Sequence, residues 1–418
     1  MQLSKKSVCS ALAIGACALL GTASPSVAGS ATWEVDTGVS SYIEADDRIK
    51  VVEFSGAAKT SFGDDQTLKL KITVDTITGA SPNGATPSSR PQTFTSPSGN
   101  TKYDINPGDT PLDPTFRDSR LAASAGWEQG ITSMLKGNMG LFASTETDHL
   151  SAGLNGGLSL DLNNRNTTLF AGLSYEYGKV SPVGGTPRAM MTTGPGVEKT
   201  STGDSESLGI ADALAGITQT LSRRLLTQLN YSYSQSGGYL TNPYKVLSAV
   251  DATTGETIDY VFERRPDSRT RQSVFWRLKY SFDQDVVDLS YRYMWDDWEI
   301  NSHTVTLKYF LAAPNRSVLE PYLRFYTQTA AYFHRSSVIL ADDMPQYASA
   351  DTRLGKFDAY SVGLKYSTKG WRSSTMGARL EFYAQKGEDH PQDAIGVQKN
   401  MDLYPEASAL VAQLFFSF

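Results

Sequence analysis

The last ten residues of the chain, Ala409–Phe418, read ALVAQLFFSF and alternate between two kinds of side chain. The apolar positions share one face: Leu410, Ala412, Leu414, Phe416 and Phe418. A period of two residues is that of a β-strand with one face against an apolar environment. An uncovered aromatic edge strand in water would pair with other molecules. We therefore expect this strand to close a barrel, with a neighbour on each side and lipid outside.

The N-terminus has the features of a secretory signal peptide. Lys5 and Lys6 precede an apolar run, Val8–Leu20, and Ser26–Ala28 supplies a small-x-small cleavage site. The run is too short to cross a membrane as a helix. The pattern predicts a signal peptide over residues 1–28 and a single barrel over 29–418.

Both cysteines, Cys9 and Cys17, fall within this segment, so the processed chain should have neither a disulfide nor a cysteine-ligated metal. A lipid anchor at Cys17 is disfavoured, because the apolar run continues past it and no polar residue follows.

Length and composition leave the fold class open. A chain of 418 residues with a net charge of −6 could form one large or two medium domains. After the signal peptide no apolar run approaches 18 residues, which excludes helical membrane spans. Only alternate residues of a barrel strand face lipid, so the negative mean hydropathy does not argue against a membrane barrel.

Alternating segments fill the rest of the chain. In one of them Val274, Trp276 and Leu278 alternate with Phe275, Arg277 and Lys279, a pattern that is hard to place in a soluble core. We count sixteen such segments: Thr32–Ile43, Ile49–Thr60, Thr67–Thr76, Leu121–Gly130, Lys136–Thr145, Leu150–Leu162, Thr167–Val180, Leu208–Leu221, Leu225–Ser236, Thr270–Phe282, Val286–Trp295, His303–Ala312, Leu319–Phe333, Ala359–Thr368, Ser374–Lys386 and Tyr404–Phe418.

The lengths of the links between segments follow a rule. The third, seventh, ninth, thirteenth and fifteenth links are long, and all are odd: Gly79–Asp118, Ser181–Ser205, Gly237–Ser268, His334–Asp358 and Gly387–Leu403. In an up-and-down barrel odd links share one rim. The pattern predicts an all-β, transmembrane, up-and-down antiparallel barrel of about 16 strands, with long extracellular loops and short periplasmic turns. Fourteen or eighteen strands are the alternatives.

Aromatic residues are expected to form two belts at the strand ends, as a spanning barrel requires. Six lie near the long-loop rim: Tyr175, Tyr177, Tyr231, Tyr233, Tyr293 and Trp295. Seven lie near the other rim: Tyr280, Phe282, Tyr309, Tyr366, Trp371, Phe416 and Phe418. The alternative for any single tyrosine is that it is simply a favourable strand residue.

If one face of the strands meets lipid, the other encloses the lumen. The predicted pore-lining residues are mostly basic: Lys69, Lys71, Arg277, Lys279, Asp288, Arg292, Lys308, Arg324, Lys365, Arg379 and Glu381. Charges on a buried strand face require water or partners, and sixteen strands enclose more space than side chains fill. Passive passage of small solutes with weak anion selectivity follows. The alternative is that the charges pair across strands in a barrel plugged by its loops.

Enzymatic and metal sites are less favoured. Asp296, Asp297 and His303 flank one hairpin and could activate water, which suggests a surface hydrolase at the outer rim, but no second acidic pair accompanies them. Asp342 and Asp343 with Asp351 could hold a divalent cation, although solvated loop charge is the better account.

We therefore expect no catalytic residues, no metal and no cofactor. No haem, Walker or dinucleotide motif occurs in a suitable context, and the basic residues are too dispersed for nucleic acid.

Several segments resemble a widespread bacterial family of outer-membrane proteins of uncharacterised function. They include SGGYLTNPYKVLS from Ser236, DDWEINSHT from Asp296 and PYLRFYTQ from Pro321. The resemblance implies an outer-membrane barrel and assigns no catalytic or ligand residue.

The terminal strand itself, with Leu410, Leu414, Phe416 and Phe418 on its apolar face, resembles the assembly signal that ends such proteins. It implies the barrel-assembly machinery, membrane lipid and lipopolysaccharide as partners, and leaves a homo-oligomer open.

Three functions remain at this point. The first is a porin-like channel or gated transporter for small hydrophilic solutes. The second is a non-conducting scaffold or assembly partner for periplasmic or surface proteins, and the third is the rim hydrolase. Conductance of the purified protein separates the first from the second.

The ninth link generates a prediction of its own. Gly237 and Gly238 leave the strand, and Tyr239, Pro243, Tyr244 and Lys245 then form a semi-rigid loop that could fold across the pore as a constriction. Deleting the loop Gly237–Ser268 should raise single-channel conductance in planar bilayers. Unchanged conductance would remove the constriction.

Overall fold

The structure is a computed structural model that describes residues 33–46, 48–63, 65–95, 102–192, 201–313, 316–339, 344–370, 374–391 and 394–418. The predicted signal peptide, Trp371 and the pair Asp342 and Asp343 lie outside these residues. None of the described helices is long and apolar enough to span a membrane.

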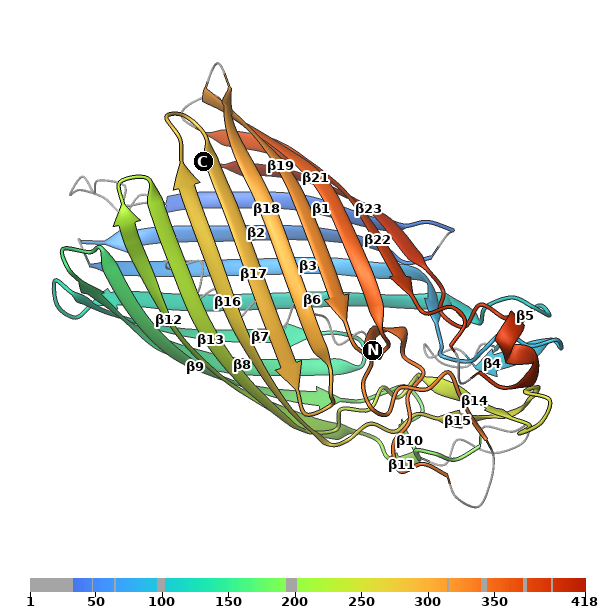
Figure 1. The fold of residues 1–418 in the computed structure, drawn as a ribbon. Coiled ribbons are helices and arrows are strands. Elements are labelled where there is room, and N and C mark those ends of the chain that lie inside the picture. The colour runs from blue at the N-terminus through green and yellow to red at the C-terminus, as the bar shows by residue number, and fades with distance from the viewer. Residues whose placement is uncertain are drawn as a thin grey trace.

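Within the described residues, sixteen strands form one closed barrel in which each strand pairs antiparallel with its neighbours along the sheet (Figure 1). Its strands are β1 (Trp33–Glu44), β2 (Lys50–Phe62), β3 (Gln66–Pro82), β6 (Leu112–Gly130), β7 (Leu135–Thr145), β8 (His149–Leu162), β9 (Thr167–Val180), β12 (Glu206–Ser222), β13 (Leu225–Gly238), β16 (Ser268–Ser281), β17 (Val286–Asp296), β18 (Asn301–Ala313), β19 (Ser317–Gln328), β21 (Phe357–Lys369), β22 (Thr375–Gly387) and β23 (Ala407–Ser417). The predicted fold class and the strand number are confirmed.

The first and last strands close the barrel. Strand β1 pairs with β23 over nine residues in register, from Asp36 opposite Ser417 to Glu44 opposite Ala409. At the very end, the Val35 amide donates to the Phe418 carbonyl at 2.7 Å, and the Phe418 amide donates to the Val35 carbonyl at 2.9 Å. No edge is left at the seam, because each strand beside it has its full set of partners.

Two predicted strand ends are wrong for the same reason. The segment ending at Phe333 leaves the barrel after Gln328, and the segment starting at Tyr404 joins it only at Ala407. Phe333 and Tyr404 are almost fully buried in loop structure instead, where Phe333 packs on Trp298 and Tyr404 on Phe357. Their side chains pack against inward-facing residues at the end of the barrel, which a strand pattern cannot distinguish from a lipid-facing position.

The outer surface of the barrel is apolar. In β23 the predicted apolar face points outward, with Phe416 and Phe418 exposed by 49% and 67%. The same alternation puts large exposed side chains on other strands, such as Leu154, Leu173 and Val362. Contiguous exposed apolar surface of this extent is foreign to soluble monomers.

The five long links gather beyond one rim of the barrel (Figure 1). They comprise residues 83–111, 181–205, 239–267, 329–356 and 388–406, and we call their described parts the cap. The cap contains the hairpins β4 (Gln92–Thr95) with β5 (Lys102–Ile105) and β10 (Thr186–Pro187) with β11 (Ser201–Gly203), the sheet of β15 (Thr257–Phe262), β14 (Val246–Val250) and β20 (Ser337–Ile339), and the 3-10 helices η2 (Thr352–Leu354) and η4 (Gly396–Asn400). The predicted segregation of long links is confirmed.

The cap has an apolar core built from separate links. Leu247 and Val261 of the β14–β15 hairpin pack with Val338 and Ala348 of the link 329–356. The parallel pairing of β14 with β20 joins the same two links through the backbone.

A second apolar cluster connects the cap to the barrel. Leu208 and Ile210, on the inward face of β12, pack with Trp298, Phe333 and Leu354. The cap is therefore packed onto the inner side of the barrel end.

A chain of side-chain hydrogen bonds crosses four of the links. The hydroxyl of Thr86 donates to the hydroxyl of Ser248 at 2.9 Å, and the Gln398 amide donates to Thr86 at 3.2 Å. Ser337 donates in turn to the Gln398 carbonyl at 2.9 Å. Satisfied buried polar networks of this kind fix one arrangement of the segments that they join.

We expect the cap to unfold separately from the barrel. Leu247 is fully buried, whereas Ile258 in the same hairpin is 59% exposed. Leu247→Ala should destabilise the cap by about 2–5 kcal/mol, and Ile258→Ala should leave it unchanged. Limited trypsin digestion of the folded protein in detergent measures this as faster cleavage within the long links. Equal cleavage of the two variants would contradict the packed cap.

Candidate functional site

The strand register places all eleven predicted pore-lining residues on the inward face. Lys279, Asp288 and Lys308 are direct neighbours across three strands, and Lys365 lies opposite Arg379. The apolar residues between them, such as Leu278 and Leu364, face outward. That the inward residues line a conducting pore stays a prediction.

Charge is unevenly distributed around the inner surface. The inward face of strands β16 to β22, which we call the basic wall, has more cations than carboxylates: Arg269, Arg271, Arg277, Lys279, Arg292, Lys308, Arg324, Lys365, Lys369 and Arg379 against Asp288, Asp296, Glu320 and Glu381. On β1 to β13 the inward carboxylates include Glu34, Asp36, Glu44, Glu53, Asp75, Asp118, Glu128, Asp161, Glu176, Glu206 and Asp212, against the cations Lys59, Lys69, Lys71, Arg120 and Lys136. The interior therefore has a positive and a negative side.

Ion pairs neutralise part of the basic wall. Asp288 accepts from Arg277 Nε at 2.8 Å and lies 3.7 Å from Lys279 Nζ. Lys308 pairs with Glu320 at 3.2 Å. These pairs hold long side chains against the wall, and their net charge is small.

Three other cations of the wall, Arg292, Arg324 and Lys365, have no carboxylate within ion-pair distance among the described residues. The Arg292 guanidinium lies 5.5 Å from the Phe275 ring centre, and Lys365 Nζ lies 4.7 Å from that of Phe415. Arg324 and Arg292 are exposed to the interior. The charge of these cations is therefore not neutralised by a carboxylate of the described residues.

The predicted constriction loop is held in place by contacts with neighbouring segments at the rim. Gly238 adopts φ +101°, and a Cβ there would lie 2.4 Å from the Ser207 carbonyl oxygen, so only glycine fits. Tyr244 donates to Asp148 at 2.6 Å, and Lys245 donates to the Pro82 carbonyl. These contacts fasten the loop to neighbouring links at the rim. Its role as a constriction stays a prediction.

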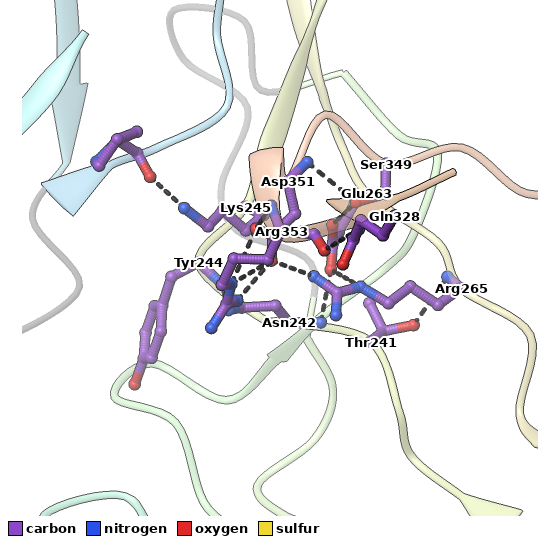
Figure 2. Close-up of polar contacts among 11 residues, drawn as sticks. Thr241, Asn242, Tyr244, Lys245, Glu263, Arg265, Gln328, Ser349, Asp351 and Arg353 are labelled. Atoms are coloured by element: carbon purple, nitrogen blue, oxygen red, sulfur yellow. Dashed lines mark hydrogen bonds and ion pairs between the residues drawn. The ribbon is translucent and has the colours of Figure 1, made fainter. Parts of the chain in front are cut away.

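A buried ionic cluster lies where two links meet (Figure 2). Arg265 contacts Glu263 at 2.7 Å and Asp351 at 2.8 Å, and Arg353 donates to Asp351 at 2.9 Å. Glu263 and Asp351 are only 1% and 2% exposed. Asn242 and Ser349 supply further hydrogen bonds to Glu263.

Electrostatics within the cluster are coupled. Burial opposes ionisation of Asp351, but Arg353, Lys245 and Arg265 outweigh it and hold its pKa well below the usual range. Burial lowers the pKa of Lys245 to about 8. Breaking one partner of such a network leaves an uncompensated buried charge, so the cluster fastens the link 239–267 to the link 329–356. No local sequence pattern associates residues so far apart in the chain.

The residues proposed for a hydrolase do not form a site. Asp296 faces inward and accepts from Arg269 at 2.8 Å, and Asp297 accepts from the Thr270 amide at 2.9 Å. His303 faces outward, with its Nδ1 2.8 Å from the Tyr291 hydroxyl and its ring stacked on Tyr293. The imidazole and the Asp296 carboxylate lie on opposite faces of the sheet, and both have structural partners.

One acidic group at the rim was not predicted. Carboxylate oxygens of Asp118, Glu146 and Asp148 lie within 4.8 Å of one another. Asp118 accepts from the Thr147 amide and hydroxyl, while Asp148 accepts from Tyr244. Burial, reinforced by Asp118, raises the pKa of Glu146 to about 7. Asp351, part of the predicted cation site, instead pairs with Arg265 and Arg353.

Comparison with known proteins assigns the chain to a family. A family model described as a protein of unknown function, DUF3570, matches residues 9–418. The chain belongs to this family. The predicted resemblance to a family without an established function is confirmed. No curated protein matches the chain.

Several solved structures are similar to this chain at low sequence identity. The ferric enterobactin receptor PfeA of Pseudomonas aeruginosa is 10% identical, with 92% of this chain and 59% of that chain covered and a TM-score of 0.46. A bacterial polysaccharide outer membrane secretin is 10% identical, with coverages of 92% and 97% and a TM-score of 0.45. The outer membrane protein opdK of Pseudomonas aeruginosa is 8% identical, with coverages of 93% and 99% and a TM-score of 0.42. The chain spans about three fifths of the receptor's length, and these similarities say nothing about its function.

The raised pKa of Glu146 predicts that the stability of the rim at this hairpin depends on pH. The folded state holds this proton more tightly than the unfolded chain, so the β7–β8 hairpin should lose stability as pH rises from about 4.5 through about 7. Hydrogen exchange of the amides at 144–152, corrected for intrinsic rates, should be severalfold faster at alkaline than at acidic pH. Glu146→Gln should abolish this difference. An unchanged difference in the variant would contradict the assignment.

Proposed function

We propose that this protein is an outer-membrane channel for small hydrophilic solutes, weakly selective for anions and gated by its cap. One observation carries the proposal. The barrel wall has a continuous apolar outer face, and its inner face holds cations, such as Arg292 and Arg324, that have no carboxylate partner among the described residues.

The outer face supports a membrane location. A closed barrel satisfies every strand hydrogen bond within the protein, which is the condition for crossing lipid without a helix. Exposed residues such as Leu173, Val362 and Phe382 need an apolar surrounding. With the predicted signal peptide, this favours the outer membrane, with the short-turn rim on the periplasmic side. Contacts with lipopolysaccharide, the assembly machinery or a second copy are further predictions.

The inner face supports conduction. Barrels of this strand number enclose more volume than inward side chains fill. Small anions would be attracted to the basic wall, and the opposite acidic side would orient dipolar solutes across the lumen. The partial neutralisation by ion pairs such as Lys308–Glu320 argues for weak selectivity.

The cap supports gating. It packs onto the inner side of the long-loop rim through Leu208, Ile210 and Trp298, so a solute entering from that side must pass it. The cluster of Glu263, Arg265 and Asp351 holds two of its links together. Opening would require separating these links.

A scaffold that does not conduct is the second candidate. The packed cap favours it, because an ordered outer surface can present a fixed binding face. Purified protein in planar bilayers separates the two functions: a channel passes ions alone, and a scaffold does not. The surface hydrolase has no support, since Asp296 and His303 lie on opposite faces.

Substitution by arginine should destabilise the barrel far more on the outer face than on the inner face. Leu154 is 56% exposed on the outer face, and its neighbour Asn155 faces inward. Leu154→Arg should destabilise the membrane-inserted barrel by about 2–4 kcal/mol, whereas Asn155→Arg should cost far less. Urea unfolding in phospholipid vesicles measures both. Similar losses for the two variants would contradict a lipid-facing Leu154.

Selectivity should follow inward charge alone. Arg292→Glu reverses an exposed inward charge, and Lys179→Glu makes the same change on the outward face of β9. The first should shift the reversal potential in a salt gradient toward cations, and the second should leave it unchanged. The proposal fails if neither variant, or both equally, changes the ion preference of an otherwise conducting protein.

A further inference from the structure

The basic wall contains a partly enclosed pocket among the described residues. It has a volume of about 180 Å³ and lies between β18, β19, β21, β22 and β23. Its polar lining consists of Lys308, Glu320, Lys365, Arg379 and Gln413. The pocket therefore has room for a small solute, such as a monosaccharide.

The aromatic ring of Tyr322 lines the pocket and packs against the barrel wall. Tyr322 is mostly buried and lies over Gly363, where an added Cβ would come within 2.8 Å of the ring. Lys308 and Arg379 approach the Tyr322 ring at 5.8 and 5.2 Å from its centre. The ring therefore positions two cations toward the cavity instead of leaving them free in solution.

The pocket has more positive than negative side chains, and only some of its cations are paired with a carboxylate. Lys308 and Arg379 are each paired, with Glu320 and Glu381 respectively. Lys365 has no carboxylate within ion-pair distance among the described residues, and Nζ rests 4.7 Å from the centre of the Phe415 ring. It supplies the uncompensated positive charge of the cavity, next to the fork of Arg379.

Two other groups would contact a different part of a ligand. The Glu320 carboxylate can accept hydrogen bonds from hydroxyl groups, and the Gln413 amide can both donate and accept. A site that combines an unpaired cation, a guanidinium, a carboxylate acceptor and an amide matches a solute with one carboxylate and several hydroxyls. A solute with several negative charges would be repelled by Glu320.

We infer that this pocket is a binding subsite for a small hydroxylated monocarboxylate, of the sugar-acid class. Lys365 and Arg379 bind its carboxylate, and Glu320 and Gln413 bind its hydroxyls. The inference rests on the proposed channel function and names the solute class of that lumen. The pocket lies in the short-turn half of the barrel, since Lys365 and Arg379 are each four residues from that end of their strands. Binding must be weak enough for release.

The test measures binding separately from conduction. Full-length processed protein in detergent micelles is titrated with glucuronate and, in parallel, with glucose, and saturation is followed by ligand-observed NMR. The wild type should bind glucuronate saturably and glucose at least about tenfold more weakly, the loss expected when a charge-assisted contact is missing. Lys365→Met should weaken glucuronate binding by a similar factor.

Two control variants locate the site. Lys365→Arg keeps the charge and should retain binding, which excludes a general folding defect. Lys71→Met removes an inward lysine from β3, which does not line the pocket, and should change affinity less than about twofold, within the error of the measurement. Saturable binding that Lys365→Met leaves unchanged would overturn the inference, as would the absence of saturable glucuronate binding.

Conductance of the same preparations separates the two proposals. A protein that conducts but does not bind glucuronate retains the channel function and loses the subsite. A protein that binds glucuronate through Lys365 but never conducts retains the subsite and loses the channel.

Discussion

The structure depends on closing the hydrogen-bonded sheet between its first and last strands. The seam from Val35 to Glu44 against Ala409 to Phe418 leaves neither β1 nor β23 with an open edge. In lipid an open edge would leave backbone groups without partners, at several kcal/mol for each. Once the sheet is closed, side-chain alternation alone decides what lies outside and what lies inside.

The two faces then separate stability from function. Apolar residues such as Leu154 and Val362 face outward and set the environment that the barrel needs. Charges such as Arg292 and Lys365 face inward, so they do not interrupt the apolar outer surface. The cap is separate from both, since the core around Leu247 and the ionic cluster consist of loop residues and not of outward- or inward-facing residues of the barrel strands. Leu247 and Arg265 therefore stabilise the cap and not the barrel wall.

Sequence periodicity was sufficient for the wall because strand pairing there is between neighbours. Residues from Val274 to Lys279 show the alternation directly, and the links between strands followed the odd and even rule. Sequence periodicity failed where a residue packs or pairs with a residue that is distant in the chain. Phe333 and Tyr404 were placed in strands although they lie in loops and pack on inward-facing residues of distant strands. Asp351 was treated as loop charge although Arg265, 86 residues away, neutralises it. No local pattern reveals such pairs. The pocket around Lys365 could not be predicted either, because its lining residues come from five strands.

The central claim is that alternate residues of one strand face lipid and water, and a cysteine scan of Val274–Lys279 tests it most directly. Both natural cysteines lie at positions 9 and 17, within the predicted signal peptide, so each introduced thiol would be the single one in the processed chain. In lipid vesicles, a charged, membrane-impermeant thiol reagent should modify cysteines at 275, 277 and 279 and spare those at 274, 276 and 278. Equal modification at all six positions would contradict the account.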